Sequence, residues 1–373
     1  MKQMFNMGRI FIILAFIGIS FSLVAKDIEH TKAGKIKNEE KFNAGTMIIE
    51  HITDAHEWHI AKVGETDISI PLPIILYDES KIVAFCSSRF HHGEKSYNGY
   101  KIETEGKNKN KIVRVMEDGI NTDKNAPLPL DFSITKNTFS LFISLLLLCV
   151  VFITIARRYT RNPNSPPKGL QSLLEPLILF IRDDVVKPSI GAKYEKYMPY
   201  LLTVFFFIFF SNLLGIVPFF PGGANLTGNI AITMVLALFT FFITTFSGNK
   251  SYWVHIVNTP GVPWWLKIPI PLMPVVEIIG VITKPFVLMV RLFANISAGH
   301  IIILGFIGLI FIFGQMNVGI GYGASVISVA FAVFMGLIEL LVAFLQAYVF
   351  TLLSALYFGM ATTEHEHKKE HAH

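Results

Sequence analysis

Charged residues are scarce in this chain of 373 residues: only 16% are Asp, Glu, Lys or Arg, while 52% are hydrophobic. Several apolar runs approach or exceed the length of about twenty residues that an α-helix needs to cross a bilayer. A soluble enzyme or a nucleic-acid-binding protein would not carry such runs, although the formal net charge is +5. The composition therefore predicts an all-α polytopic membrane protein.

Cysteine is also nearly absent. The two cysteines are Cys86, in a polar part of the chain, and Cys149, in an apolar run, so we do not expect them to meet. This excludes a disulfide framework and a cysteine-based zinc site. His51, His56 and His59 leave a metal site open, but solvated histidines on a strand or loop are the simpler interpretation.

The first third of the chain divides into a leader and a polar domain. Residues 1–25 are typical of a signal peptide, because Lys2 and Arg9 precede an apolar run that ends in small residues. An uncleaved anchor helix is the alternative. Residues 26–138 contain short alternating apolar runs with Asn-Gly and Asp-Gly turns, which predict a small β-rich extracytoplasmic domain. We assign no chemistry to this domain.

Residues 139–362 form the predicted membrane domain, with about five membrane helices. The first three spans are expected at residues 140–155, 200–217 and 230–246. Three arginines follow the first span, so the positive-inside rule places its end in the cytoplasm. Residues 170–186 are interrupted by a Glu-Pro pair and end in charged residues, which favours an interfacial helix.

Two longer apolar segments follow at residues 272–313 and 324–360, with a loop expected at 314–323. Each segment is too long for one upright span and slightly short for two spans with a turn. Length therefore leaves open two long tilted helices or four short ones. The tail, residues 363–373, is polar and is expected in the cytoplasm.

The two long segments contain very few Asp, Glu, Lys, Arg or His side chains. They are Glu277, Lys284, Arg291, His300 and Glu339. An unpaired arginine at the bilayer centre costs about 3 kcal/mol on insertion scales. Arginine cannot avoid this cost by losing its proton. Arg291 must therefore face a partner, a water-filled space or a mobile counter-charge, with a snorkelling arginine near a span end as the alternative.

Helical spacing places several of these residues on one face. Glu277, Lys284 and Arg291 recur every seven residues, which is about two turns, and Asn295 extends the same face by one more turn. In one continuous helix, Glu277 would lie about 21 Å from Arg291 along the axis. A carboxylate on the inner side of a fixed positive charge predicts the inner part of an ion path.

The outer side offers a second titratable group if the two segments form an antiparallel hairpin. With Gln346 level with Arg291, His300 and Glu339 reach nearly the same depth. An imidazole and a carboxylate that face each other can pass a proton. The arrangement predicts two proton half-paths separated by Arg291, while a buried pair that only locks two helices is the alternative.

The stretch RLFANISAGH from Arg291 and the later ELLVAFLQAYVFTLLSALYFGMA from Glu339 closely resemble the a subunit (subunit 6) of F-type ATP synthases. The resemblance covers about residues 140–363. It implies a non-catalytic, proton-conducting stator subunit of the bacterial inner membrane that lies against the c-subunit ring. The implied partners are b-type peripheral stalk subunits, the F1 catalytic sector and membrane lipid. The implied transported ion is H⁺, and the resemblance implies neither a cofactor nor nucleic acid.

The resemblance also implies roles for single residues. Arg291 matches the arginine that faces the ring carboxylate, and Gln346 matches the glutamine beside it. His300 and Glu339 match the acid and imidazole of the outer path in swapped order, and Glu277 matches an acidic position near the inner path. Both long segments are then expected to be single, steeply tilted helices.

Two other classes of protein remain as alternatives. An ion-coupled secondary transporter predicts inverted repeats and spans broken near the midplane, and the sequence shows no such repeat. A membrane anchor or assembly factor would leave the ionisable residues of the long segments unexplained.

Overall fold

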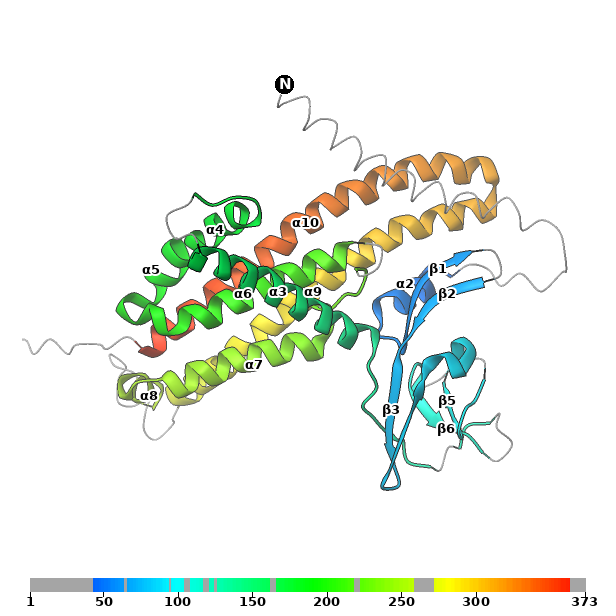
Figure 1. The fold of residues 1–373 in the computed structure, drawn as a ribbon, viewed down its shortest axis with the longest axis horizontal. Helices are drawn as coiled ribbons and strands as arrows, with labels where there is room; N and C mark the ends of the chain where they lie inside the picture. The colour runs from blue at the N-terminus through cyan, green and yellow to red at the C-terminus, as the bar shows by residue number, and fades with distance from the viewer. Residues whose placement is uncertain are drawn as a thin grey trace, which may run out of the picture.

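The computed structural model describes residues 43–63, 66–93, 95–103, 108–116, 121–123, 126–161, 166–217, 222–257 and 272–362. Helices dominate this part of the chain, and a smaller strand-containing domain precedes the first long helix (Figure 1). The expected signal peptide, residues 1–25, and the expected tail, residues 363–373, lie outside the described residues.

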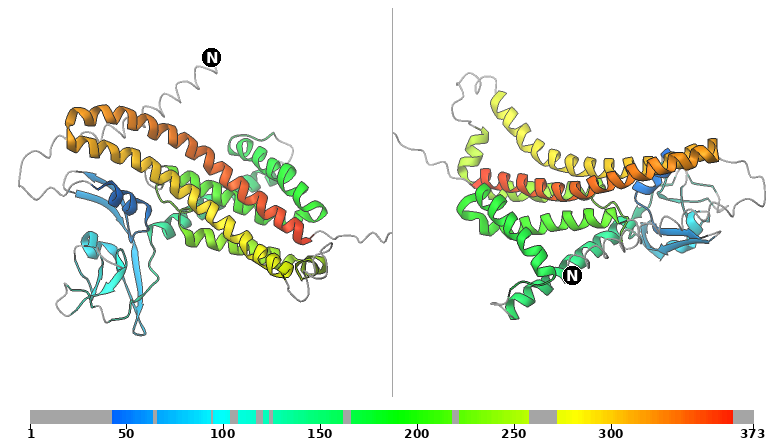
Figure 2. Two further views of the ribbon diagram at one scale, coloured as in Figure 1. Left: turned by 180° about the vertical axis from the view of Figure 1, so that it is seen from behind. Right: turned by 90° about the horizontal axis from the view of Figure 1, so that it is seen from above.

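Five helices of the described chain are long and apolar enough to cross a membrane, as the sequence predicts. The fourth and fifth are unbroken, so each long apolar segment forms a single helix. They lie side by side as an antiparallel hairpin (Figure 2). The helices are α3 (Lys136–Arg161), α6 (Tyr194–Ile216), α7 (Ile230–Ser247), α9 (Leu272–Met316) and α10 (Val318–Thr362).

The turn between α9 and α10 is much shorter than the loop expected at residues 314–323, so that prediction was wrong. Only Asn317 lies outside the two helices. Its side-chain oxygen accepts a hydrogen bond from the Gly319 amide at 2.8 Å and caps the start of α10. A Cβ atom on Gly321 would lie only 2.7 Å from the Cα atom of Gly314, so these glycines allow close helix packing.

The segment before α6 is helical but irregular. Ile181, Val185 and Val186 are fully buried and belong to the core around α6. Gly359 of α10 allows this segment to pack closely against α10, because a Cβ atom at position 359 would overlap the Ser189 carbonyl oxygen. The interfacial location of residues 170–186 stays a prediction. The elements are α4 (Leu170–Phe180), the π-helical η3 (Ile181–Val186), α5 (Lys187–Ile190) and the 3₁₀ turn η4 (Gly191–Lys193).

An aromatic core joins α6 to α10. Phe205 and Phe206 of α6 are almost completely buried, and Phe344 of α10 meets Phe205 edge-on at 6.0 Å between ring centroids. α7 packs mainly against α9, and α3 packs against the far side of α6. Within the described part of the chain, the hairpin of α9 and α10 therefore keeps one long side free of contacts with the other elements (Figure 2).

The N-terminal domain is built mainly from short antiparallel strands, which confirms a β-rich domain. Three small sheets pair in the orders β1-β2, β4-β3-β7 and β5-β6. Their core contains Ile74, Leu76, Phe90, Tyr100 and Ile112. The elements are α2 (Ala44–Ile52), β1 (Glu57–Val63), β2 (Thr66–Pro71), β3 (Pro73–Asp78), β4 (Lys81–Cys86), η1 (Ser87–Gly93), β5 (Tyr100–Ile102), β6 (Ile112–Arg114) and β7 (Leu130–Asp131).

Several contacts join this domain to the membrane helices, to both α3 and α9. The Asp54 carboxylate accepts a hydrogen bond from the backbone N–H of Asn137 at 3.0 Å and so caps α3. Helix α2 packs on α9, where a Cβ atom on Gly308 would lie 3.1 Å from the Ala44 Cβ atom. The domain therefore lies where α3 begins, and we call this end of the helices the domain end (Figure 1).

Candidate functional site

His300 of α9 and Glu339 of α10 meet near the domain end. The His300 Nδ1 atom lies 2.5 Å from Oε1 of Glu339, and the exposed fractions of the two side chains are 13% and 5%. Nδ1 also lies 3.2 Å from the Ile296 carbonyl oxygen. When Glu339 is ionised, both neighbours of Nδ1 are acceptors, so Nδ1 must carry a hydrogen. The structure therefore brings together the two groups that the sequence predicts at one depth.

Polar groups from α6 and from the following loop lie close to this pair, and the sequence analysis missed them. Ser297, one turn before His300, donates a hydrogen bond to the Gly228 carbonyl oxygen at 3.5 Å. Asn212 of α6 accepts a hydrogen bond from Thr227 of that loop and donates one to a backbone carbonyl of α10. The loop is buried here, so the region near His300 contains more hydrogen-bonding groups than the helix pattern alone indicates.

Two further buried side-chain atoms lie in α6 and in the loop that follows it, namely Ser211 Oγ and Asn225 Nδ2. Neither atom has a hydrogen-bond partner among the described residues. A buried polar group without any partner costs about 1–3 kcal/mol. Hydroxyl and amide groups of this kind are suited to hold ordered water. The chemistry of this region therefore suits a hydrated route to His300.

Arg291 lies on the free side of the hairpin. Its side chain is exposed and forms no hydrogen bond or ion pair within the described part of the chain. Asn295, one turn further on, is exposed as well, and the nearby Phe286 is 59% exposed. A permanent cation on an apolar surface of a membrane helix needs a partner, which for Arg291 lies beyond the described residues.

Two of the contacts between α9 and α10 define the register of the helices around Arg291. One is the pair of His300 and Glu339, and the other is Lys284, whose ammonium nitrogen lies 5.5 Å from the centroid of the Tyr357 ring. Arg291 lies between the two α9 residues, and Gln346, which is buried, lies between the two α10 residues. An antiparallel pair of regular helices therefore places Gln346 within about one turn of the level of Arg291.

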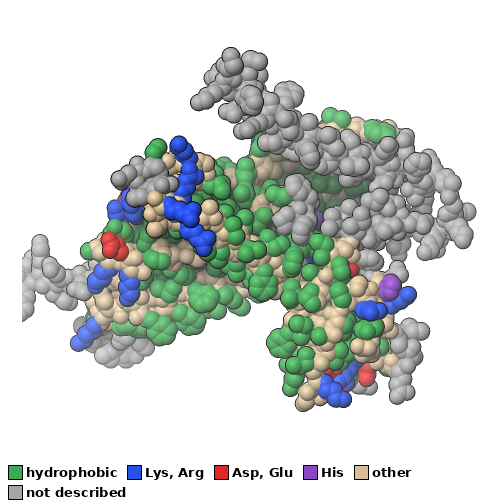
Figure 3. Space-filling model, in the orientation of Figure 1, with side chains coloured by type: hydrophobic (Ala, Val, Ile, Leu, Met, Phe, Trp, Pro, Cys, Tyr) green, Lys and Arg blue, Asp and Glu red, His purple; other side chains and the backbone are tan. Residues whose placement is uncertain are grey.

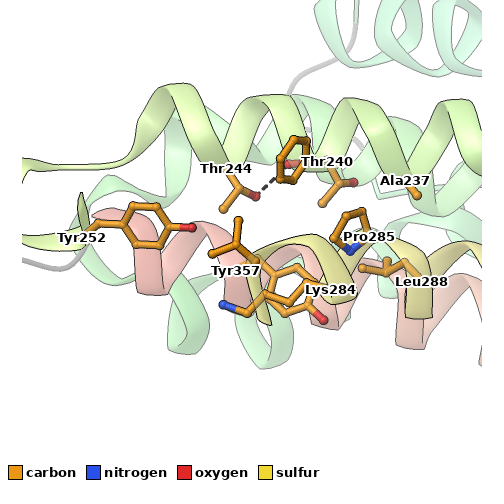
Figure 4. Close-up of a pocket in the computed structure, with 10 residues that line it drawn as sticks. Ala237, Thr240, Thr244, Tyr252, Lys284, Pro285, Leu288 and Tyr357 are labelled. Carbon is orange, nitrogen blue, oxygen red and sulfur yellow. Dashed lines mark hydrogen bonds between the residues drawn. The ribbon is translucent and has the colours of Figure 1, made fainter. Parts of the chain in front are cut away.

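Glu277 lies near the opposite end of α9 and faces a helix that the sequence analysis did not predict. This helix is α8 (Lys250–Val257), and the His255 Nδ1 atom lies 3.8 Å from Oε1 of Glu277. Tyr252 of α8 points into a small cavity beside Lys284, which Figure 4 shows. The signal for α8 was weak, because a short helix within a loop rich in proline and tryptophan has little periodicity.

Residues of four helices, α7, α8, α9 and α10, line the cavity. Thr240 and Thr244 of α7 line one side, and Lys284 of α9 and Tyr357 of α10 line the other (Figure 4). Hydroxyl, phenol and ammonium groups therefore follow α9 from Glu277 towards Arg291. These groups do not reach the domain-end pair, because Glu277 and His300 are separated by about 34 Å along one unbroken helix.

The described residues contain no group of three or more His, Cys, Asp or Glu side chains that could hold a metal ion. Of the three histidines that left a metal site open, His56 is paired with Asp131 at 2.7 Å inside the N-terminal domain. This pair links the domain core to the strand before α3.

Comparison with known protein families shows which family this chain matches. A family model described as ATP synthase A chain matches residues 138–359, which is more than half of the chain. The chain belongs to this family. The match begins in α3 and ends near the end of α10, so it contains all the residues of the candidate site. Family membership makes the chain a multi-pass subunit of the ATP synthase membrane sector.

Individual relatives agree with the family model. An ATP synthase subunit a 2 of Prosthecochloris aestuarii is 48% identical over 249 residues, which cover 65% of this chain and 73% of the relative. An ATP synthase subunit a of Chloroherpeton thalassium is 44% identical over 251 residues, covering 65% and 71%. An ATP synthase subunit a of Myxococcus xanthus is 44% identical over 252 residues, covering 65% and 78%. The N-terminal domain matches a second model, a domain of unknown function, over residues 47–132.

Proposed function

We propose that the chain conducts protons through two half-paths that end on either side of Arg291. The observation that supports this most strongly is the separation of two titratable pairs along one helix. His300 and Glu339 form one pair near the domain end, and Glu277 and His255 form the other near the opposite end. Arg291 lies between the two pairs on the free side of the hairpin.

The pair near the domain end has the chemistry of a proton relay. Glu339 is buried, and its carboxylate oxygen is in contact with the imidazole nitrogen of His300. The two nitrogens of an imidazole are separate proton sites, so His300 can take a proton on one side and release one on the other. Asn212, Ser297 and the loop after α6 supply hydrogen-bonding groups beside it.

The proton must then leave the chain to pass Arg291. A carboxylate on a moving partner, as in a ring of c subunits, fits this requirement. Its attraction to a guanidinium 4 Å away is about 4 kcal/mol at an effective dielectric constant of 20. That favours deprotonation opposite Arg291 and still permits the carboxylate to move on. Asn295 and Gln346 lie within reach of the same level and supply hydrogen bonds there.

The pair near the opposite end completes the route. Glu277 receives or releases the proton, and Lys284, Tyr357 and the cavity hydroxyls lie between it and Arg291. The fixed charge of Arg291 repels a proton that would otherwise pass directly from one half-path to the other. Transport of H⁺ is thereby linked to movement of the ring.

The proposal includes a location and partners. The chain is placed in a bacterial inner membrane, with the N-terminal domain extracytoplasmic and the C-terminus in the cytoplasm. The c-subunit ring, b-type stalk subunits, lipid and, through the complex, the F1 sector are its partners, and the chain itself makes no ATP. A reporter fused after His373 is expected to be active in the cytoplasm. Activity on the outer side would overturn this orientation.

An ion-coupled secondary transporter is less consistent with the fold. Such transporters use helices that are interrupted near the membrane midplane. Both α9 and α10 are continuous over 45 residues each. Continuous helices with a long free side suit a surface that another subunit moves across.

Replacement of the arginine tests the proposal. We expect Arg291→Lys to abolish ATP synthesis driven by an imposed proton gradient, because an ammonium group cannot present the planar fork of a guanidinium. Thr283→Val, on an exposed part of the same helix, serves as the control and should keep synthesis. Normal synthesis by the arginine variant would refute the role of Arg291.

A further inference from the structure

The three-stranded sheet of the N-terminal domain is apolar on both faces. Its inner face carries Ile74 and Leu76, which are fully buried in the domain core. Side chains alternate between the faces of a strand, so Ile75 and Tyr77 point outward. Sheets with one solvated face normally carry polar residues on that face. The outward face of this sheet therefore requires a separate explanation.

The strand register shows how far the apolar outward face extends. Tyr77 of β3 pairs with Ile82 of β4 on one side and with Leu130 of β7 on the other. Directly paired residues point to the same side of a sheet. Phe132 follows beside Ile75, because its amide donates to the Ile75 carbonyl oxygen at 2.9 Å. The four most exposed of these side chains are Ile82 (73%), Phe132 (65%), Leu130 (58%) and Tyr77 (42%).

The outward face lies close to the point where the chain enters the membrane. Only three residues separate Phe132 from Lys136, the first residue of α3, and the four residue steps between them span at most about 14 Å. The first turns of α3 expose Phe142, Leu145 and Leu146. The exposed apolar residues of α3 thus follow, within a few residues of the sequence, those on the outward face of the sheet.

The position of the domain supports the same conclusion. Asp54 caps α3, and Trp58 packs edge-on against Phe139 at 5.9 Å between ring centroids, so the domain cannot lie far from the helix start. β3 runs across the direction of the membrane helices rather than along it (Figure 1). Hydrophobic side chains gather on the side of the domain nearest the helices, while charged side chains lie at its lower and right edges (Figure 3).

We propose that the outward face of sheet β4-β3-β7 lies in the interface of the bilayer leaflet at the domain end, in contact with lipid. The aromatic side chains of Tyr77 and Phe132 suit this region, where aromatic rings of membrane proteins concentrate. Ile82 and Leu130 would contact the upper parts of the acyl chains. The N-terminal domain then has a second, monotopic membrane contact in addition to the membrane helices.

Lipid explains the exposed face better than the other two surroundings. Water would leave a cluster of large apolar side chains exposed, and soluble surfaces rarely carry such clusters. A protein partner would need a surface placed beside the start of α3, where the exposed residues of that helix already require a lipid environment. The contact with lipid does not depend on the proton half-paths, so it can fail or hold independently of them.

Spin labels measure the surroundings of these positions. Single cysteines would replace Ile82, Phe132 and, as control, Met116, in a chain that carries Cys86→Ser and Cys149→Ser. Met116 is 48% exposed in the same domain but follows β6, in a different sheet. The full complex would be reconstituted in vesicles of phosphatidylethanolamine and phosphatidylglycerol. The relaxation of each label would be compared with oxygen, which concentrates in lipid, and with a water-soluble nickel chelate.

The proposal predicts that oxygen relaxes the labels of Ile82→Cys and Phe132→Cys more strongly than the nickel chelate does, and that the order is reversed for Met116→Cys. Stronger relaxation by the nickel chelate at Ile82→Cys and Phe132→Cys would mean that the face is solvated. Little relaxation by either reagent at both positions would mean that protein covers the face, from another subunit or a second copy of this chain. Either of these results would overturn the proposal.

Discussion

Glu339 of α10 lies directly over Gly299 of α9, one residue before the histidine that its carboxylate contacts. A Cβ atom at Gly299 would lie 3.1 Å from Oε1 of Glu339, which is closer than ordinary contact. The missing side chain therefore gives the carboxylate the room that it needs beside His300. The close approach of α9 and α10 at Gly299 and the position of the pair of His300 and Glu339 therefore depend on the same contact.

Removal of either member of this pair should slow proton uptake from the domain end. We expect His300→Ala and Glu339→Ala to lower proton flux by about a hundredfold, the usual contribution of a positioned acid–base group. The double variant His300→Glu/Glu339→His keeps one acid and one imidazole and should retain most of the flux. Flux in membrane vesicles measures this. Unchanged flux in both single variants would show that the pair only locks the helices together.

A larger side chain at Gly299 should separate the pair without changing either member. Gly299→Val is expected to displace the Glu339 carboxylate and to lower flux from the domain end. Gly305→Val serves as the matched control, because a Cβ atom at Gly305 meets nothing within 4 Å in this chain. Proton flux at equal amounts of assembled complex compares the two. Equal flux would mean that the contact at Gly299 does not position Glu339.

The N-terminal domain should lose stability in acid through Asp78. Burial opposes ionisation of this carboxyl, but hydrogen bonds from Arg114 and Tyr100 outweigh burial and hold its pKa below the usual value. A lowered folded-state pKa stabilises the fold above the unfolded value of about 3.9. This stabilisation is lost as the pH falls through the folded-state pKa. Amide exchange in β3 and β4, corrected for its intrinsic pH dependence, should therefore increase in strong acid.

A variant separates this effect from general acid unfolding. Asp78→Asn should destabilise the domain at neutral pH by about 1–3 kcal/mol, because Tyr100 and Arg114 lose a charged acceptor. The stability of the Asp78→Asn domain should also change less with pH in the acid range than the stability of the native domain does. Glu79→Gln is the control, since Glu79 is 70% exposed and its ion pair with Arg114 is worth at most about 1 kcal/mol. Identical pH profiles of the native chain and of Asp78→Asn would contradict the assignment.

The membrane part of the fold follows closely from the sequence because each helix carries a long apolar run. The structure confirms the five membrane helices and shows that both long segments are single helices, which length alone had left open. The loop expected at residues 314–323 was wrong. Gly314 and Gly321 lie within α9 and α10, where they bring the two helices into close contact.

The candidate site was predictable only in part. Helical spacing identified the shared face of Glu277, Lys284 and Arg291, and an antiparallel register predicted the meeting of His300 with Glu339. Spacing could not identify contacts from distant segments. His255 approaches Glu277 from α8, and Thr227 reaches Asn212 from a loop, and neither segment has a periodic pattern that shows its neighbour. The roles of these residues in transport stay predictions.

Passive proton flux through the membrane sector, with the catalytic sector removed, tests the central claim most directly. Vesicles with the native chain and with Arg291→Ala would be compared under an imposed potential, with and without a reagent that blocks the ring carboxylate. The account predicts that the native sector conducts, that the reagent stops this flux, and that Arg291→Ala loses the part of the flux that the reagent blocks. Equal, reagent-sensitive flux in both would show that Arg291 does not separate two half-paths.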